Sequence, residues 1–285
     1  MALGLFELVV FILTAAFLAG LAGSVLGIGG GIFLVPYLTL GIGLGVREAV
    51  ATSLIGVIAT SSGAASVYVR DRLTNIRLGM FLEVATTIGA IAGAFLTLFL
   101  SEFALQILFG VVVAYTAVFM LRTRETARER AVIARPESPL ATSLRLSSYY
   151  FDPEDQAVYR YRVERPMAGF SMSALAGAIS GLLGLGGGFV KVPAMNVLMR
   201  VPMKVAVATS NFMIGVTAAA SAFIYYSRGF VDPTLAGMVI VGVFLGTAVG
   251  TRVLERVPAT AVRAAFAIVL VGLAVVMIGR GIGIL

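Results

Sequence analysis

A glycine-rich run that occurs twice constrains this chain more than any other feature. The run GIGGG at Gly27–Gly31 recurs 157 residues later as GLGGG at Gly184–Gly188, and a proline stands five residues after each. Over the seventeen positions that end at these prolines, eight residues are identical. The steps Ala49–Ser53 and Ala206–Ser210 are also identical at the same offset. A register held over this length indicates a duplicated unit.

Glycine runs of this kind break helices. Glycine adopts backbone conformations closed to other residues, and a following proline cannot donate to a helix. Within a membrane, the amide and carbonyl groups freed by a break are tolerated only beside protein or a watery cavity. The repeated run therefore predicts two broken helices that line a shared binding site, as in transporters built from repeats. The alternative is close helix packing through small residues.

The composition places the chain in a membrane. Of its 285 residues, 59% are hydrophobic and 12% are charged, and the mean hydropathy is +1.02. This is typical of an all-α, polytopic membrane protein. The absence of Cys and His excludes disulfides, thiol nucleophiles, Cys/His metal sites and His-based triads. We therefore expect no enzyme, metal or cofactor, and we attribute the net charge of +7 to cytoplasmic loops rather than to nucleic-acid binding.

Ten apolar segments are expected, five in each half. They cover approximately 3–26, 30–43, 47–69, 77–100 and 103–121, and then 167–183, 188–200, 203–227, 235–254 and 259–280. In each half, the two segments joined by the glycine run return the chain to the face that it left. Three single crossings remain, so the second copy enters the membrane inverted. This predicts two inverted repeats, 1–121 and 167–285.

The link between the repeats, 122–166, holds nine of the twenty-one Lys and Arg residues. The bias of basic residues toward the cytoplasm places the link there and both termini on the other face. We expect a helical continuation over 122–130 and a β-hairpin formed by 144–151 and 157–163. A small cytoplasmic cap or dimer contact is the expected role, and regulation is the alternative.

An anion inside a membrane needs hydrogen-bond donors and positive potential in place of water. Helix N-termini that begin at the glycine runs offer both. The predicted substrate-binding glycines are Gly29, Gly30, Gly31, Gly186, Gly187 and Gly188. Short polar side chains near the start of the following helix add further donors, namely Thr52, Ser53, Thr209, Ser210 and Asn211. The alternative for these is hydrogen bonding between helices or to the preceding turn.

Lys191 is the sharpest single candidate, because it follows the second glycine run where the first half has Leu34. An intramembrane cation is a functional candidate, and snorkelling to an interface is the alternative. For Glu83 we expect an interfacial ion pair, with proton binding as the alternative. Tyr68 and Tyr225 occupy matching positions and are interpreted as anchors in aromatic belts.

Both glycine runs, the Ala-Thr-Ser steps and Asn211 resemble the sulfite exporter TauE/SafE family of membrane permeases. The resemblance covers nearly the whole chain except the link. It implies transport of sulfur-containing anions, such as sulfite and organosulfonates, across the cytoplasmic membrane of prokaryotes. It indicates a transport class rather than one substrate.

The sequence thus predicts a multi-pass secondary transporter of a small anion, most simply a sulfur-containing one, that works by alternating access in the cell membrane. No glycine run ends in Gly-Lys-Ser/Thr, so ATP hydrolysis is not expected. A passive anion channel and a membrane assembly or sensing subunit are the alternatives. Coupling to a proton or Na⁺ and a homodimer are both left open.

Overall fold

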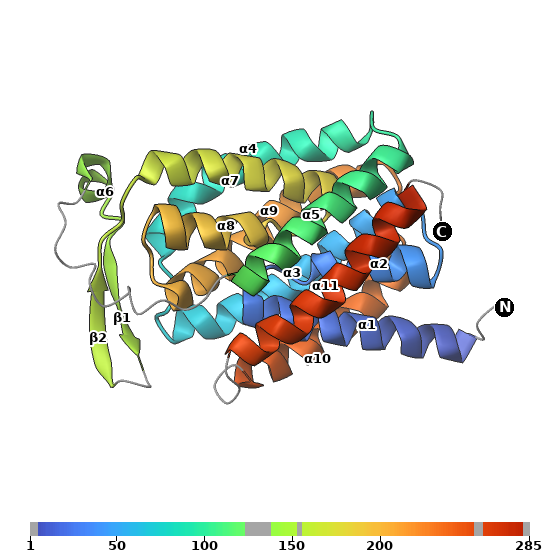
Figure 1. The fold of residues 1–285 in the computed structure, drawn as a ribbon, viewed down its shortest axis with the longest axis horizontal. Coiled ribbons are helices and arrows are strands. Elements are labelled where there is room, and N and C mark those ends of the chain that lie inside the picture. Colours follow the sequence, from blue (N-terminus) through green and yellow to red (C-terminus); the bar gives the residue numbers. More distant parts are fainter. Residues whose placement is uncertain (1–4, 123–137, 153–155, 254–258, 282–285) are drawn as a thin grey trace.

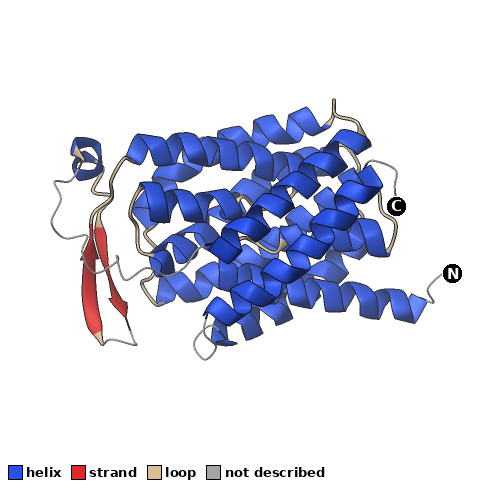
Figure 2. Cartoon of the chain, in the orientation of Figure 1, coloured by secondary structure: helices blue, strands red, loops and turns tan. Residues whose placement is uncertain are grey.

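The computed structural model describes residues 5–122, 138–152, 156–253 and 259–281, and it consists of long helices with a small hairpin at one end (Figures 1 and 2). The first half contains α1 Leu5–Leu26, α2 Gly31–Gly41, α3 Val46–Arg70, α4 Ile76–Thr97 and α5 Glu102–Arg122. The second contains α7 Pro166–Leu183, α8 Gly188–Pro193 with a π-helical continuation at Ala194–Leu198, α9 Met203–Ser227, α10 Pro233–Val253 and α11 Ala259–Gly281. These bounds follow the expected segments closely.

Six helices, α1, α3, α4, α7, α9 and α10, are long and apolar enough to cross a membrane in the part of the chain that the structure describes. Shorter apolar helices lie at Gly31–Gly41, Glu102–Val118, Gly188–Leu198 and Leu270–Gly279. Large apolar side chains stand exposed on the outside of the bundle, among them Phe99, Phe223 and Ile268. An apolar exterior over long helices identifies a multi-pass helical membrane protein.

Helices of the two halves pack mainly on each other. The principal pairs are α1 with α10, α4 with α7, α3 with α9, and α5 with α11. The 157-residue offset relates α1 to α7 and α4 to α10, so it converts the first pair into the second. It also exchanges the two members of each remaining pair. The duplication seen in the sequence is therefore repeated in the contacts.

Two of these pairs pack backbone to backbone through glycine. A Cβ at Gly89 of α4 would collide with the carbonyl oxygen of Ala174 in α7. At the related positions, a Cβ at Gly246 of α10 would collide with the carbonyl oxygen of Phe17 in α1. Small residues permit this close approach of membrane helices. Close packing is thus the role of these glycines, which lie outside the two runs.

The link folds as expected in its hairpin and differently before it. β1 Ser148–Asp152 pairs antiparallel with β2 Ala157–Tyr161, which confirms the hairpin. A short helix that was not predicted, α6 Pro139–Ser143, precedes it. The predicted helical continuation beyond residue 122 and the tip of the hairpin lie outside the described residues.

The hairpin is fastened to both halves of the bundle. Asn75, between α3 and α4, donates from Nδ2 to the Leu146 carbonyl oxygen at 2.7 Å and to the Tyr161 Oη at 2.8 Å. Leu146 and Tyr161 belong to the same buried apolar cluster as Met195 and Met199, at the end of the α8 segment. Helix α1 begins and α11 ends on the side of the molecule opposite to the hairpin (Figure 1).

Candidate functional site

Both glycine runs break helices, as predicted. Between α1 and α2, Gly29 has φ 84° and Gly30 has φ 75°. Between α7 and α8, Gly186 has φ 79° and Gly187 has φ 76°. These left-handed conformations are costly for a residue with a Cβ. The chain needs glycine at these positions because no other residue turns from one helix into the next as readily.

The two breaks lie against each other at the centre of the bundle. A Cβ at Gly31 would collide with the carbonyl oxygen of Gly184, and a Cβ at Gly188 would collide with that of Gly27. The position of a Cβ on Gly29 is 3.7 Å from the Gly186 Cα. The first residue of each new helix therefore touches the end of the helix broken in the other half.

Ser53 and Ser210 connect the breaks reciprocally. Ser53 Oγ donates to the Gly184 carbonyl oxygen at 3.0 Å, and Ser210 Oγ donates to that of Gly27 at 2.9 Å. Both serines are fully buried. The structure therefore brings them to the glycine runs, and in this conformation they make the helix-to-helix hydrogen bonds that were the alternative prediction.

Backbone donors remain free at both breaks. The amide groups of Gly29, Gly30 and Gly31 make no hydrogen bond to another described residue, and the same holds for Gly186, Gly187 and Gly188. A helix N-terminus carries a partial positive charge on such amides. The buried Oγ of Ser180, whose Cβ is 3.3 Å from the Cβ position on Gly187, also has no partner among the described residues. The breaks thus concentrate unsatisfied donors in a buried place.

The other predicted polar residues lie around this centre with separate contacts. Thr209 Oγ1 accepts from the backbone N–H of Asn75 at 3.0 Å, so it holds the corner between α3 and α4. Asn211 donates from Nδ2 to the Ser24 carbonyl oxygen at 3.3 Å, while its Oδ1 has no partner among the described residues. Thr52 is buried on α3. Among the described residues, no hydrogen bond joins either threonine to a glycine run.

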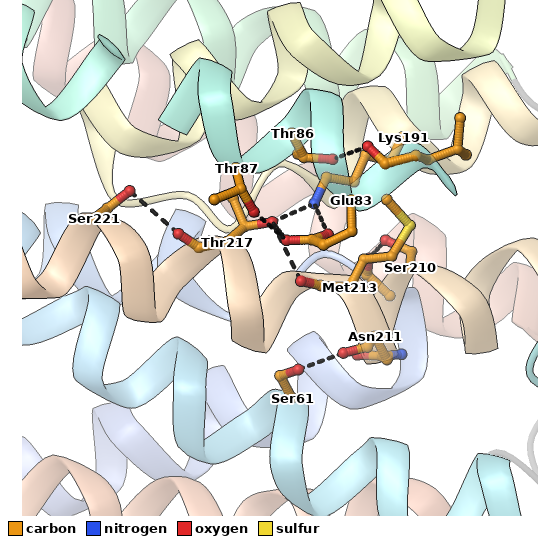
Figure 3. Close-up of polar contacts among 12 residues, drawn as sticks. Ser61, Glu83, Thr86, Thr87, Lys191, Ser210, Asn211, Met213, Thr217 and Ser221 are labelled. Atoms are coloured by element: carbon orange, nitrogen blue, oxygen red, sulfur yellow. Dashed lines mark hydrogen bonds and ion pairs between the residues drawn. The ribbon is translucent and has the colours of Figure 1, made fainter. Parts of the chain in front are cut away.

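Lys191 is fully buried, so the snorkelling interpretation is wrong. Its Nζ donates to Thr217 Oγ1 at 2.9 Å and lies 4.0 Å from Glu83 Oε2 (Figure 3). Thr217 Oγ1 in turn donates to Glu83 Oε1 at 2.8 Å, and Thr87 Oγ1 donates to the same oxygen at 3.0 Å. Glu83 therefore pairs inside the protein rather than at an interface.

The two matched tyrosines are structural rather than interfacial. Tyr68 is 5% exposed and donates from Oη to the Ser24 carbonyl oxygen at 3.0 Å. Tyr225 is 1% exposed and donates to the Gly181 carbonyl oxygen at 3.1 Å. Ser24 and Gly181 are themselves 157 residues apart, so each tyrosine stabilises the last turn before its break. The anchoring prediction was wrong, although the shared offset was the signal that linked them to the repeat.

Comparison with known proteins places this arrangement in a family. The family model of the sulfite exporter TauE/SafE matches residues 12–277. The chain belongs to the sulfite exporter TauE/SafE family. The match covers both glycine breaks, both serines and the Glu83–Lys191 pair. No solved structure matches this TauE/SafE protein.

Several relatives align with this chain along nearly their whole length. The probable membrane transporter YunE of Bacillus subtilis (strain 168) is 25% identical over 96% of this chain and 98% of its own. A probable membrane transporter of Xylella fastidiosa (strain 9a5c) is 27% identical over 92% of each chain. MJ0441 of Methanocaldococcus jannaschii is 23% identical over 86% of each. This TauE/SafE protein is therefore a membrane transporter and not an enzyme.

Proposed function

We propose that this protein is a secondary transporter that carries a small anion across the cytoplasmic membrane by alternating access, and that the anion binds between the two glycine breaks. A sulfur oxyanion such as sulfite or an organosulfonate is the proposed class, in keeping with the family description. The observation that carries the proposal is the meeting of two breaks, each with free amide donors, in the buried centre of the protein.

The chemistry of the breaks suits an oxyanion with several acceptor oxygens. Amides of two helix N-termini can donate to it, and both helix dipoles favour negative charge. The free amides of Gly29, Gly30 and Gly31 lie on one side, and those of Gly186, Gly187 and Gly188 on the other. Ser53 and Ser210 would add hydroxyl donors once they release the carbonyl oxygens that they now bind.

An anion cannot enter while the two breaks touch. The Gly31–Gly184 and Gly188–Gly27 contacts leave no space for a single additional carbon at either position. Binding therefore requires the breaks to separate, and the serine hydrogen bonds must open at the same time. A site that opens only when the halves move relative to each other is suited to alternating access.

The direction of the helices supports the inverted repeat on which this mechanism depends. Ser61 of α3 contacts Asn211 of α9, while Tyr68, further along α3, clusters with Ala208, earlier in α9. The two related helices therefore run antiparallel side by side. Two copies of one unit whose equivalent helices are antiparallel enter a membrane with opposite orientation. The position of the hairpin, on the side opposite to the start of α1 and the end of α11, agrees with this topology (Figure 1).

Counterflow in proteoliposomes tests the function. Purified protein would be reconstituted with unlabelled methanesulfonate, sulfite, sulfate or acetate inside, and labelled anion would be supplied outside. A carrier accumulates label by exchange without net flux, whereas a passive channel only equilibrates it. Exchange of a sulfur oxyanion supports the proposal. Exchange of acetate alone would contradict the proposed substrate class and indicate a carboxylate instead. If none of the tested anions moves, the proposed substrate class is wrong.

A further inference from the structure

A buried charge cluster connects the two halves, and its charged residues have no charged counterparts in the repeat. It consists of Glu83 on α4, Lys191 on α8 and Thr217 on α9, joined through the threonine hydroxyl (Figure 3). The positions related to Glu83 and Lys191 by the 157-residue offset are Ile240 and Leu34. Each half therefore contributes one charged residue, Glu83 from the first and Lys191 from the second, at a position where the other half carries an apolar residue.

Packing alone does not account for these charges. Leu34 is fully buried, like Lys191, so the fold accommodates an apolar side chain at the equivalent place. Removing two charges from water costs several kcal/mol per ion, and a buried pair is weak evidence for stability. Ionisable groups kept inside a membrane protein are functional candidates for this reason.

The pairing within the cluster is incomplete. Glu83 Oε2 is buried without a hydrogen bond to any residue that the structure describes, and Lys191 Nζ is 4.0 Å away. The ammonium group has three donors, and among the described residues it has one hydrogen-bond acceptor, Thr217 Oγ1. Both charged groups thus keep unused capacity for a further partner, a proton on the carboxylate and an anion on the ammonium.

The cluster lies next to the glycine breaks. Lys191 is in the first turn of α8, where its amide donates to the Gly187 carbonyl oxygen at 3.1 Å. Ile214, one turn before Thr217 on α9, has its Cγ2 3.0 Å from the Cβ positions of both Gly29 and Gly186. Any separation of the breaks that moves the start of α8 therefore moves Lys191 relative to Glu83.

We propose that Glu83 is the proton-coupling residue of this transporter, and that it takes up a proton when an anion binds beside Lys191. This inference rests on the proposed transport function. Without substrate, the Glu83 carboxylate balances the Lys191 ammonium. An arriving anion places a second negative charge beside the same cation, and like charges disfavour ionisation of the carboxylate. A proton from water then forms an O–H bond on Glu83, and the anion becomes the counterion of Lys191.

The groups that surround Glu83 and Lys191 on the neighbouring helices are uncharged. Thr87 and Thr217 face Glu83 with neutral hydroxyls. Helix α7, which packs along α4, contains no charged residue between Pro166 and Leu183. Arg77 and Lys204 lie in the first turns of α4 and α9, at least six residues along the helix from the cluster. The net charge of the cluster therefore depends on the protonation of Glu83 and Lys191 and on the bound substrate.

Proton uptake by the purified protein tests this directly. Methanesulfonate is added to the protein in weakly buffered detergent solution, because its sulfonate does not titrate near neutral pH, and bound anion is measured in parallel. The wild type should take up about one proton for each bound anion, by linkage of the two equilibria. Glu83→Gln should bind the anion without proton uptake. Glu102→Gln, at an exposed acid on α5, is the matched control and should behave as wild type.

Transport measurements separate this inference from the proposed function. Glu83→Gln should retain methanesulfonate counterflow and lose accumulation driven by a pH gradient. A wild type that exchanges the anion but takes up no proton overturns proton coupling and leaves the transport function standing. A wild type that neither binds nor exchanges any tested anion overturns both. If Glu83→Gln does not fold, the wild type alone still tests whether anion binding takes up a proton, and a wild type that takes up none overturns the proposal.

Discussion

Adding one methyl group at the contact between the breaks tests whether they must stay in close approach. Gly31 is suited to this because its φ is not positive, so Gly31→Ala adds crowding without left-handed strain. The new Cβ would collide with the Gly184 carbonyl oxygen and lie 2.9 Å from both Ser53 Oγ and Val57 Cγ2. Overpacking of this kind costs about 1–3 kcal/mol, and it should force the breaks apart in the closed conformation.

Two other glycines serve as controls for the effects of a Gly→Ala change other than crowding, which are backbone strain and helix propensity. Gly43 has φ 73° and no atom within 4 Å of its Cβ position, so Gly43→Ala introduces backbone strain of about 1–2 kcal/mol without crowding. Gly237 lies in α10 with open space around it, so Gly237→Ala should gain about 1 kcal/mol of helix propensity. Neither position is near the breaks.

Thermal unfolding in detergent and counterflow in proteoliposomes are measured on the same three variants. We expect Gly31→Ala to lower the unfolding temperature and to lose most of its exchange activity per folded molecule. Gly43→Ala should lose stability but retain activity, and Gly237→Ala should gain a little stability and retain activity. Wild-type stability and exchange in Gly31→Ala would refute the close contact of the breaks and their place at the site.

Three further predictions concern the two serines at the breaks, the Glu83–Lys191 pair and the hairpin. Ser53→Ala and Ser210→Ala each remove one reciprocal hydrogen bond, so each should destabilise the closed state by a similar 0.5–1.5 kcal/mol, approximately, in thermal unfolding; a large difference between them would contradict their equivalence. Lys191→Met leaves the Glu83 carboxylate buried without its counterion and should cost about 3–5 kcal/mol, whereas the double variant with Glu83→Gln should recover much of this loss. Burial raises the pKa of Tyr161 to about 12 from the model-compound value of 10.0. Tyr161 thus holds its proton more tightly in the folded protein than in the unfolded chain. Its contribution to folding stability is complete below pH 10 and is lost as the pH rises toward 12. Tyr161→Phe should remove this loss of stability at alkaline pH, measured by proteolysis of the link.

The sequence was sufficient for the helices and the breaks because both leave strong local signals. Long apolar stretches predict spanning helices from their length alone. Repetition at a fixed offset linked Gly29 to Gly186 before any contact was known, and glycine is the residue that left-handed turns favour. The serines after the matching Ala-Thr steps were predicted near the breaks for the same reason.

The partners of polar side chains were not predictable in the same way. Whether a membrane residue faces lipid or protein depends on the rotation of its helix, which packing against neighbours determines. Tyr68 and Tyr225 were therefore assigned to interfaces, although both bind carbonyl oxygens inside the protein. The pairing of Glu83 with Lys191 joins helices of different halves, and neither position has a charged counterpart in the repeat that could have indicated it.

The central claim is that the two breaks separate, open in turn to each face of the membrane and receive an anion between them. Because the natural chain contains no cysteine, Ser53→Cys provides a single thiol at this place. The measurement is the rate at which a charged, sulfonate-bearing methanethiosulfonate reagent modifies that thiol from either side of sealed proteoliposomes, in a variant that still exchanges methanesulfonate. Alternating access predicts modification from both faces, slowed by methanesulfonate in each case. A thiol that reacts from one face only, or at a rate that methanesulfonate does not change, would contradict the account.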